Sequence, residues 1–226
     1  MAERTDRDQR VLDGALRLAA REGWQGASLA AIAAEAGVPL LEVYRRYPSR
    51  TAVLAALLDR VDEAVLRESR PDPNESARDR LFDVVMRRLD ALRPHKDAIA
   101  AIARALAADP VGAACLWPRF MRSMRWMLEA AGLGSAGLPG MLKAKGLAVI
   151  YLGAVRTWLG DDTADSARTM AAVDRALRRA EAVMAWGSRM GARKPSAPPD
   201  GSPSPDAQPK TPRKRPSRRG KRQTSI

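Results

Sequence analysis

Residues 28–47 read SLAAIAAEAGVPLLEVYRRY and form the most informative segment of the 226-residue chain. Ser28 is a preferred N-cap residue, so a helix is predicted over 29–36, and Gly37 is suited to end it. A second short helix is predicted over 40–47. Small apolar side chains in both segments favour close packing of the two helices at a steep angle. Such a helix-turn-helix presents its second helix to the major groove of DNA.

Helical periodicity continues on both sides of this segment, and no alternating strand pattern of useful length interrupts it. Ser49 is suited to cap the helix that follows it. The predicted fold class is therefore all-α, with a three-helix head, a C-terminal helical bundle and a disordered basic tail. The remaining helices are predicted at 7–22, 50–68, 76–92, 95–108, 110–131, 139–159 and 164–189.

Composition divides the chain into three parts, with a polar linker near 69–76. A helix-turn-helix domain is predicted over 5–65, a helical ligand-binding and dimerisation domain over 74–190, and a tail over 191–226. The tail has eight Pro and ten Lys or Arg against two Asp, within a chain of net charge +13. It cannot bury enough apolar surface to offset its ordering entropy, so disorder is predicted. The tail suits the DNA backbone or an anionic membrane surface, and a solubilising role without a partner is the third alternative.

Residue content excludes several classes of protein. One Cys and one His cannot form an intramolecular disulfide or a Cys/His zinc site. Cys115 is predicted to be a small core residue and His95 a solvated loop residue. No nucleophile–base pair or metal-ligand cluster stands out, so no enzymatic activity, cofactor or metal is expected. No uncharged apolar run reaches about 18 residues and the N-terminus is polar, which predicts a cytoplasmic protein.

The first 65 residues resemble the TetR family of bacterial transcriptional regulators. That family reads approximately Thr-x-x-x-Ile-Ala-x-x-Ala-Gly-Val-Ser-x-Gly-x-Leu-Tyr-x-His/Tyr-Phe-x-Ser-Lys-x-x-Leu, and the likeness covers about 8–65. It implies a TetR-like all-α fold with a DNA-binding head. The matching residues here are Ser28, Ile32, Ala33, Ala36, Gly37, Val38, Tyr44, Tyr47, Ser49, Arg50 and Leu54.

The resemblance implies DNA contacts residue by residue. Tyr44 matches a tyrosine that contacts phosphate, Arg50 matches a lysine near the DNA backbone, and Ser28 matches a threonine that caps its helix and touches phosphate. Arg45 and Arg46 project from the predicted recognition helix toward a guanine edge or a phosphate. The complete predicted DNA-binding set is Ser28, Pro39, Leu40, Leu41, Glu42, Tyr44, Arg45, Arg46, Tyr47 and Arg50.

The recognition helix departs from the family pattern at its start. The run PLLE, which ends at Glu42, stands where relatives usually have Ser, a variable residue, Gly and a small hydroxyl residue. Glu42 brings negative charge toward the phosphates, although Arg45 or Arg46, three and four residues on, can neutralise it. A helix-turn-helix kept as a scaffold without specific DNA binding is the alternative interpretation.

The C-terminal helices supply candidate ligand-binding and dimerisation residues. Large soft side chains over 110–131 predict an apolar ligand pocket, with a purely core role as the alternative. Two narrow apolar seams predict a homodimer through 139–159 and 164–189, with packing inside one subunit as the alternative. The pocket residues are Trp117, Phe120, Met121, Met124 and Met127; the seams are Leu147, Tyr151, Ala154 and Trp158, then Met170, Val173, Leu177, Ala180 and Met184.

A second, looser resemblance covers about a hundred residues between Asp79 and Glu181. The runs RLFDVVMRRLDAL (80–92), GLAVIY (146–151) and WLGDD (158–162) are similar to lipid-binding accessory proteins of ubiquinone biosynthesis, which share the TetR fold. Two functions are therefore expected. The first is a dimeric repressor that binds a palindromic operator in double-stranded DNA and is released by an apolar small ligand. The alternative is a protein that does not bind DNA but binds isoprenoid lipid in ubiquinone biosynthesis.

Overall fold

The computed structural model describes the backbone of residues 2–191 and the side chains of 5–182. Within these residues all regular elements are helical, which confirms the predicted fold class. Apart from Gly191, the predicted tail lies outside the described residues. The elements are α1 (Ala2–Glu22), α2 (Leu29–Ala36), α3 (Leu40–Arg46), α4 (Arg50–Arg67), α5 (Ala77–Leu92), the short 3-10 helix η1 (Arg93–His95), α6 (Lys96–Ala108), α7 (Pro110–Ala130), α8 (Gly137–Leu159) and α9 (Ala167–Gly191).

Local capping residues set the ends of the head helices. The Ser28 hydroxyl accepts a hydrogen bond from the Ala31 backbone N–H at 3.1 Å, and the Ser49 hydroxyl does the same for Ala52 at 3.1 Å. Gly37 ends α2 with φ of +62°, a left-handed conformation that an L side chain would strain. Both serine caps were predicted from the sequence, and both are confirmed.

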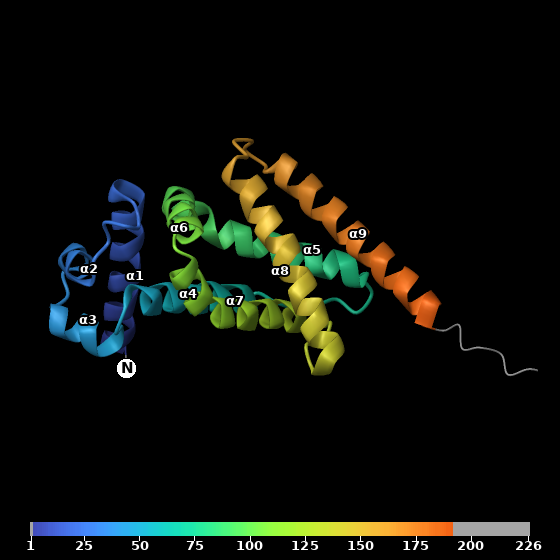
Figure 1. Ribbon diagram of the computed structural model, residues 1–226, viewed down its shortest axis with the longest axis horizontal. Helices are drawn as coiled ribbons and strands as arrows, with labels where there is room; N and C mark the ends of the chain where they lie inside the picture. Colours follow the sequence, from blue (N-terminus) through green and yellow to red (C-terminus); the bar gives the residue numbers. More distant parts are fainter. Residues whose placement is uncertain (1, 192–226) are drawn as a thin grey trace, which may run out of the picture.

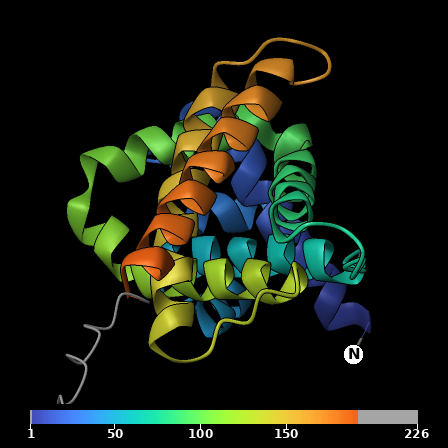
Figure 2. The ribbon, with the colours of Figure 1, turned by 90° about the vertical axis from the view of Figure 1, so that its right-hand side faces the viewer.

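The molecule is elongated, with the head at one end and α9 at the other (Figure 1). Helix α4 leaves the head and runs alongside α7. Helix α5 packs against both α4 and α7, and α8 packs against α7. Helices α8 and α9 lie side by side when the molecule is seen end-on (Figure 2). Because α4 belongs to both halves, it is one of the links between the head and the C-terminal helices.

The head core includes a helix that the sequence assigned to the other domain. Ala98, Ile102 and Ala105 of α6 are buried in the cluster formed by α1, α2, α3 and the first half of α4. A second cluster holds the remaining C-terminal helices together. The head thus packs against α6 and is not joined to the C-terminal helices by α4 alone.

The predicted seams of α8 and α9 pack inside one subunit. Leu147, Tyr151, Ala154 and Trp158 are all buried, as are Val173 and Leu177 of α9. Met170 and Ala180 of the α9 seam are only half-buried. For the buried residues, packing inside one subunit, the alternative to a dimer seam, is therefore correct, and these residues are not available to a second chain. Met184 lies outside the described side chains.

The opposite face of α8 is apolar and exposed. Leu138, Leu142 and Val149 have exposed fractions of 73%, 69% and 74%. Helix α8 contains an 18-residue stretch with a mean hydropathy of 1.3, which is long and apolar enough to cross a membrane, a test that core helices of soluble proteins also pass. Lys143, Lys145 and Arg156 interrupt this helix, so the sequence predicts no membrane span here.

Three smaller expectations were wrong. Cys115 is exposed on α7, because the first turns of that helix project away from the core. His95 lies in η1 and is half-buried, and this burial, reinforced by the charge of Arg60, lowers its pKa. Helix α9 begins at Ala167 rather than 164, because the Asp161 carboxylate accepts hydrogen bonds from the Thr163 and Thr169 hydroxyls and holds the preceding loop.

Candidate nucleic-acid interface

Helix α3 is anchored through one face and exposed on the other. Val43 and the Tyr47 ring that follows the helix are buried, at 1% and 3% exposure. Leu41 and Tyr44 are more than half exposed, and Arg45 is exposed too. The chain therefore presents the outer face of α3 to solvent, at the end of the molecule farthest from α9 (Figure 1).

Two ion pairs tie α3 to the start of α1. Arg7 donates to Glu42 at 2.9 Å, and Arg46 donates to Asp8 at 3.2 Å. The Tyr47 hydroxyl also donates to Asp8, at 3.1 Å, and burial together with that carboxylate raises the pKa of Tyr47 to about 12. The charge of Glu42 is thus neutralised, but by Arg7 of α1 rather than by Arg45 or Arg46 as expected.

The other predicted DNA-binding residues lie around the two short helices. Ser28 caps α2, and Pro39 precedes α3, where it needs no backbone N–H. Arg50 donates to the backbone carbonyls of Trp24 and Gln25, at 3.2 and 3.0 Å. Its guanidinium therefore holds the turn between α1 and α2 in this structure, which is a positioning role that the sequence did not reveal.

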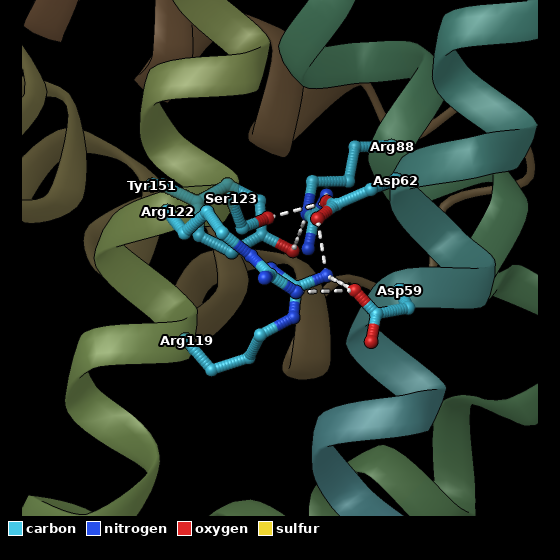
Figure 3. A network of polar contacts seen from close by, with 7 residues as sticks. All are labelled: Asp59, Asp62, Arg88, Arg119, Arg122, Ser123 and Tyr151. Carbon is cyan, nitrogen blue, oxygen red and sulfur yellow. Dashed lines mark hydrogen bonds and ion pairs between the residues drawn. The ribbon is translucent and has the colours of Figure 1, made fainter.

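A buried polar network lies where α4 leaves the head (Figure 3). The Asp62 carboxylate of α4 accepts hydrogen bonds from Arg88 of α5, and from Ser123 and Arg119 of α7, the last at 2.8 Å. Arg88 also donates through Nε to the Tyr151 hydroxyl of α8, at 3.1 Å. Asp62 thereby links α4 directly to α5 and α7, and through Arg88 to α8.

The network is cationic and incompletely paired. Arg88 and Asp62 have side-chain exposures of only 1% and 6%, and Arg119 has 10%. Three buried N–H groups, Arg88 Nη2 and Arg119 Nε and Nη1, have no hydrogen-bond partner among the described residues. Nearer the surface, Asp59 accepts from Arg119, and from Arg122 at 2.9 Å. Removal of one carboxylate would leave buried guanidinium charge without compensation.

Sequence reasoning missed this network, although a signal was present. Arg88 falls within the inward stripe of α5 formed by Val84, Val85, Leu89 and Leu92. A charged residue at such a position is expected to need a buried partner. The pattern does not identify that partner, because Asp62 lies 26 residues away on another helix.

The five predicted ligand-pocket residues separate into two groups. Met124 and Met127 are fully buried in the core, whereas Phe120 and Met121 are half-buried and Trp117 is exposed. The ring of Phe120 lies 5.6 Å from that of Trp117 and 6.0 Å from that of Tyr151. An aromatic row therefore leads from the surface of α7 to the polar network.

Comparisons with known proteins agree with this architecture. Residues 11–57 match the model of a family described as bacterial regulatory proteins, tetR family. Among solved structures, a TetR transcriptional regulator from Nitrosomonas europaea ATCC 19718 is 25% identical with a TM-score of 0.63, covering 79% of this chain and 98% of that one. One from Rhodococcus sp. RHA1 is 21% identical with a TM-score of 0.56, covering 78% and 96%. Among curated proteins, no sequence matches the chain.

Proposed function

We propose that the chain is a member of the TetR family of bacterial transcriptional regulators and that it acts as a homodimeric repressor of a palindromic operator. The family comprises DNA-binding regulators rather than enzymes. The observation that carries the proposal is the outer face of α3, where Leu41, Tyr44 and Arg45 are exposed while Glu42 is neutralised by Arg7. Because Arg7 pairs with it, Glu42 repels the DNA phosphates less than an unpaired carboxylate would.

Selection from a random pool of duplexes tests DNA binding directly. The full chain is incubated with the pool at physiological salt, with excess competitor DNA to suppress sequence-independent binding by its basic residues. We expect enrichment of a two-fold symmetric motif. Binding to that motif should exceed binding to a scrambled duplex by about a thousandfold or more. Recovery of no motif would reject the assignment as a sequence-specific repressor.

Replacement of Tyr44 with Phe is expected to weaken operator binding by about tenfold to a hundredfold, the worth of one hydrogen bond to a charged phosphate. Tyr44 is 65% exposed, so the free energy of unfolding should not change. Fluorescence anisotropy on the selected operator measures the affinity. Tyr47→Phe is the matched control: it removes the bond to Asp8 and should lower stability without a comparable loss of DNA affinity. Equal DNA affinity of Tyr44→Phe and the wild type would contradict the phosphate contact.

The dimer interface is proposed on α8 and α9, with the outer face of α8 in place of its buried seam. Gly146 and Gly153 lie on the exposed side, and a Cβ added at either would meet no described atom within 4 Å beyond the neighbouring backbone of its own helix. Gly146 lies between exposed Leu142 and Val149, and Gly153 lies one turn beyond Val149, so the bare backbone at these positions allows a second helix to approach closely. The exposed apolar stripe of α8, formed by Leu138, Leu142 and Val149, would be buried by a second chain, which favours an interface there.

An apolar small molecule is proposed as the effector, held among α4, α5, α7 and α8. The aromatic row from Trp117 to Tyr151 offers its entry, and the Asp62 network lies at the inner end. Displacement of α4 there would change the spacing of the two heads. We further propose that the protein acts in the cytoplasm and that its basic tail contacts DNA or an anionic membrane.

A lipid-binding function in ubiquinone biosynthesis is the second candidate. It is favoured by the exposed apolar side chains of α8, and by the leucines that occupy the start of α3. Native mass spectrometry of the purified full chain tests it. A co-purifying isoprenoid would support this function. A protein free of lipid that selects a DNA motif would exclude it.

A further inference from the structure

The outward face of α3 holds a small and unusual set of side chains. Leu41 and Arg45 each lie two residues from buried Val43, about 200° around the helix, so both point away from the head. They are four residues apart and therefore stand one above the other. Leu40, at 51% exposure, and Tyr44 flank them on one side.

The other charged residues of α3 are occupied. Glu42 and Arg46 lie on the flank next to α1, where Arg7 and Asp8 pair with them. Arg45 has no hydrogen bond or ion pair to any other residue in the part of the chain that the structure describes. Apart from Tyr44, which is assigned to a phosphate, the chemistry that the exposed face of α3 offers to a bound duplex is thus one guanidinium and two leucines.

Leucine restricts what this face can read. In the major groove, each base pair presents hydrogen-bonding groups, and the only apolar group is the 5-methyl of thymine. A leucine pressed against any other base edge would strip water from polar groups and offer them no partner. An unpaired arginine, in contrast, matches the O6 and N7 acceptors of guanine.

On the basis of the proposed function, we propose that Leu41, with Leu40 beside it, selects a thymine methyl in each operator half-site and that Arg45 selects a nearby guanine. One helical turn separates Leu41 from Arg45, about 5.4 Å, and successive base pairs rise about 3.4 Å. The thymine and the guanine therefore lie within about two or three base pairs of each other.

Uracil substitution tests the methyl contact alone. The operator selected by the full chain is resynthesised with deoxyuridine in place of each thymidine in turn, which removes only the methyl group. At one position per half-site, affinity should fall about threefold to fivefold, the worth of one buried methyl. Leu41→Ala should bind the thymine and uracil operators equally. Leu66→Ala, which truncates another partly exposed leucine on α4, should keep the difference.

The guanine contact has its own test. Arg45→Ala should bind the selected operator about fivefold to a hundredfold more weakly and should tolerate any base at one position per half-site. Arg67→Ala, which truncates an exposed arginine of α4 outside the DNA-binding set, should keep that base preference. A selected motif without thymine, or one insensitive to uracil, would overturn the Leu41 assignment while leaving the proposed function intact. Selection of no motif would overturn both.

Discussion

Replacement of Asp62 with Ala should lower the free energy of unfolding by about 3–5 kcal/mol, the cost of removing one partner from a buried ion pair. The Asp62 carboxylate is 6% exposed and accepts from Arg88, Arg119 and Ser123. Its loss would leave two buried guanidiniums that already have unpaired N–H groups. Urea unfolding, followed by circular dichroism at fixed protein concentration, measures the change.

Asp59→Ala is the matched control, because it removes the same group one turn earlier on α4. Asp59 is 47% exposed, and exposed ion pairs contribute about 0–1 kcal/mol. If Asp62→Ala fails to fold, Asp62→Asn retains the shape and part of the hydrogen bonding and should fall between the two. Equal stabilities of the Asp59 and Asp62 variants would show that the network does not hold α4.

The network also indicates how an effector bound among the C-terminal helices would change the position of the DNA-binding head. Helix α4 contributes Val53 and Leu57 to the head core and Asp62 to the network. A ligand that displaces Arg88 or Arg119 therefore acts directly on the helix that carries the head. The large soft side chains over 110–131 predict an apolar ligand. The buried guanidiniums now place cationic groups beside that aromatic row.

Much of the fold could be predicted because its determinants are local. Ser28, Gly37 and Ser49 act on residues three or four positions away, so their effect is visible in a short stretch of sequence. The pairing of Glu42 with Arg7 is different, because it joins residues 35 apart. Such pairs depend on which helices cross and at what angle, and helical periodicity carries no such information.

Helix α8 shows a second reason why the sequence alone could not predict the packing. Periodicity identifies the inward face of a helix only when the other face is polar. Both faces of α8 are apolar, so the seam from Leu147 to Trp158 and the stripe through Leu142 and Val149 were equally good candidates for an interface. Only the packing of the neighbouring helices shows that the seam is already buried.

Replacement of Val149 with Glu is expected to give a monomer that binds the operator about a hundredfold to ten-thousandfold more weakly, because two linked heads bind far more tightly than one. Val149 is 74% exposed, so a charge there costs little in the isolated chain but would be buried without a partner in the interface. Sedimentation velocity measures the oligomeric state, and anisotropy measures the affinity.

Val111→Glu is the matched control, since this valine on α7 is 72% exposed and lies outside the proposed interface. It should remain dimeric with unchanged operator affinity. A Val149→Glu variant that stays dimeric would remove the interface from this part of α8 and leave the apolar stripe without a protein partner. Because water would then cover that stripe at a cost, a bound lipid would become the better explanation for its composition.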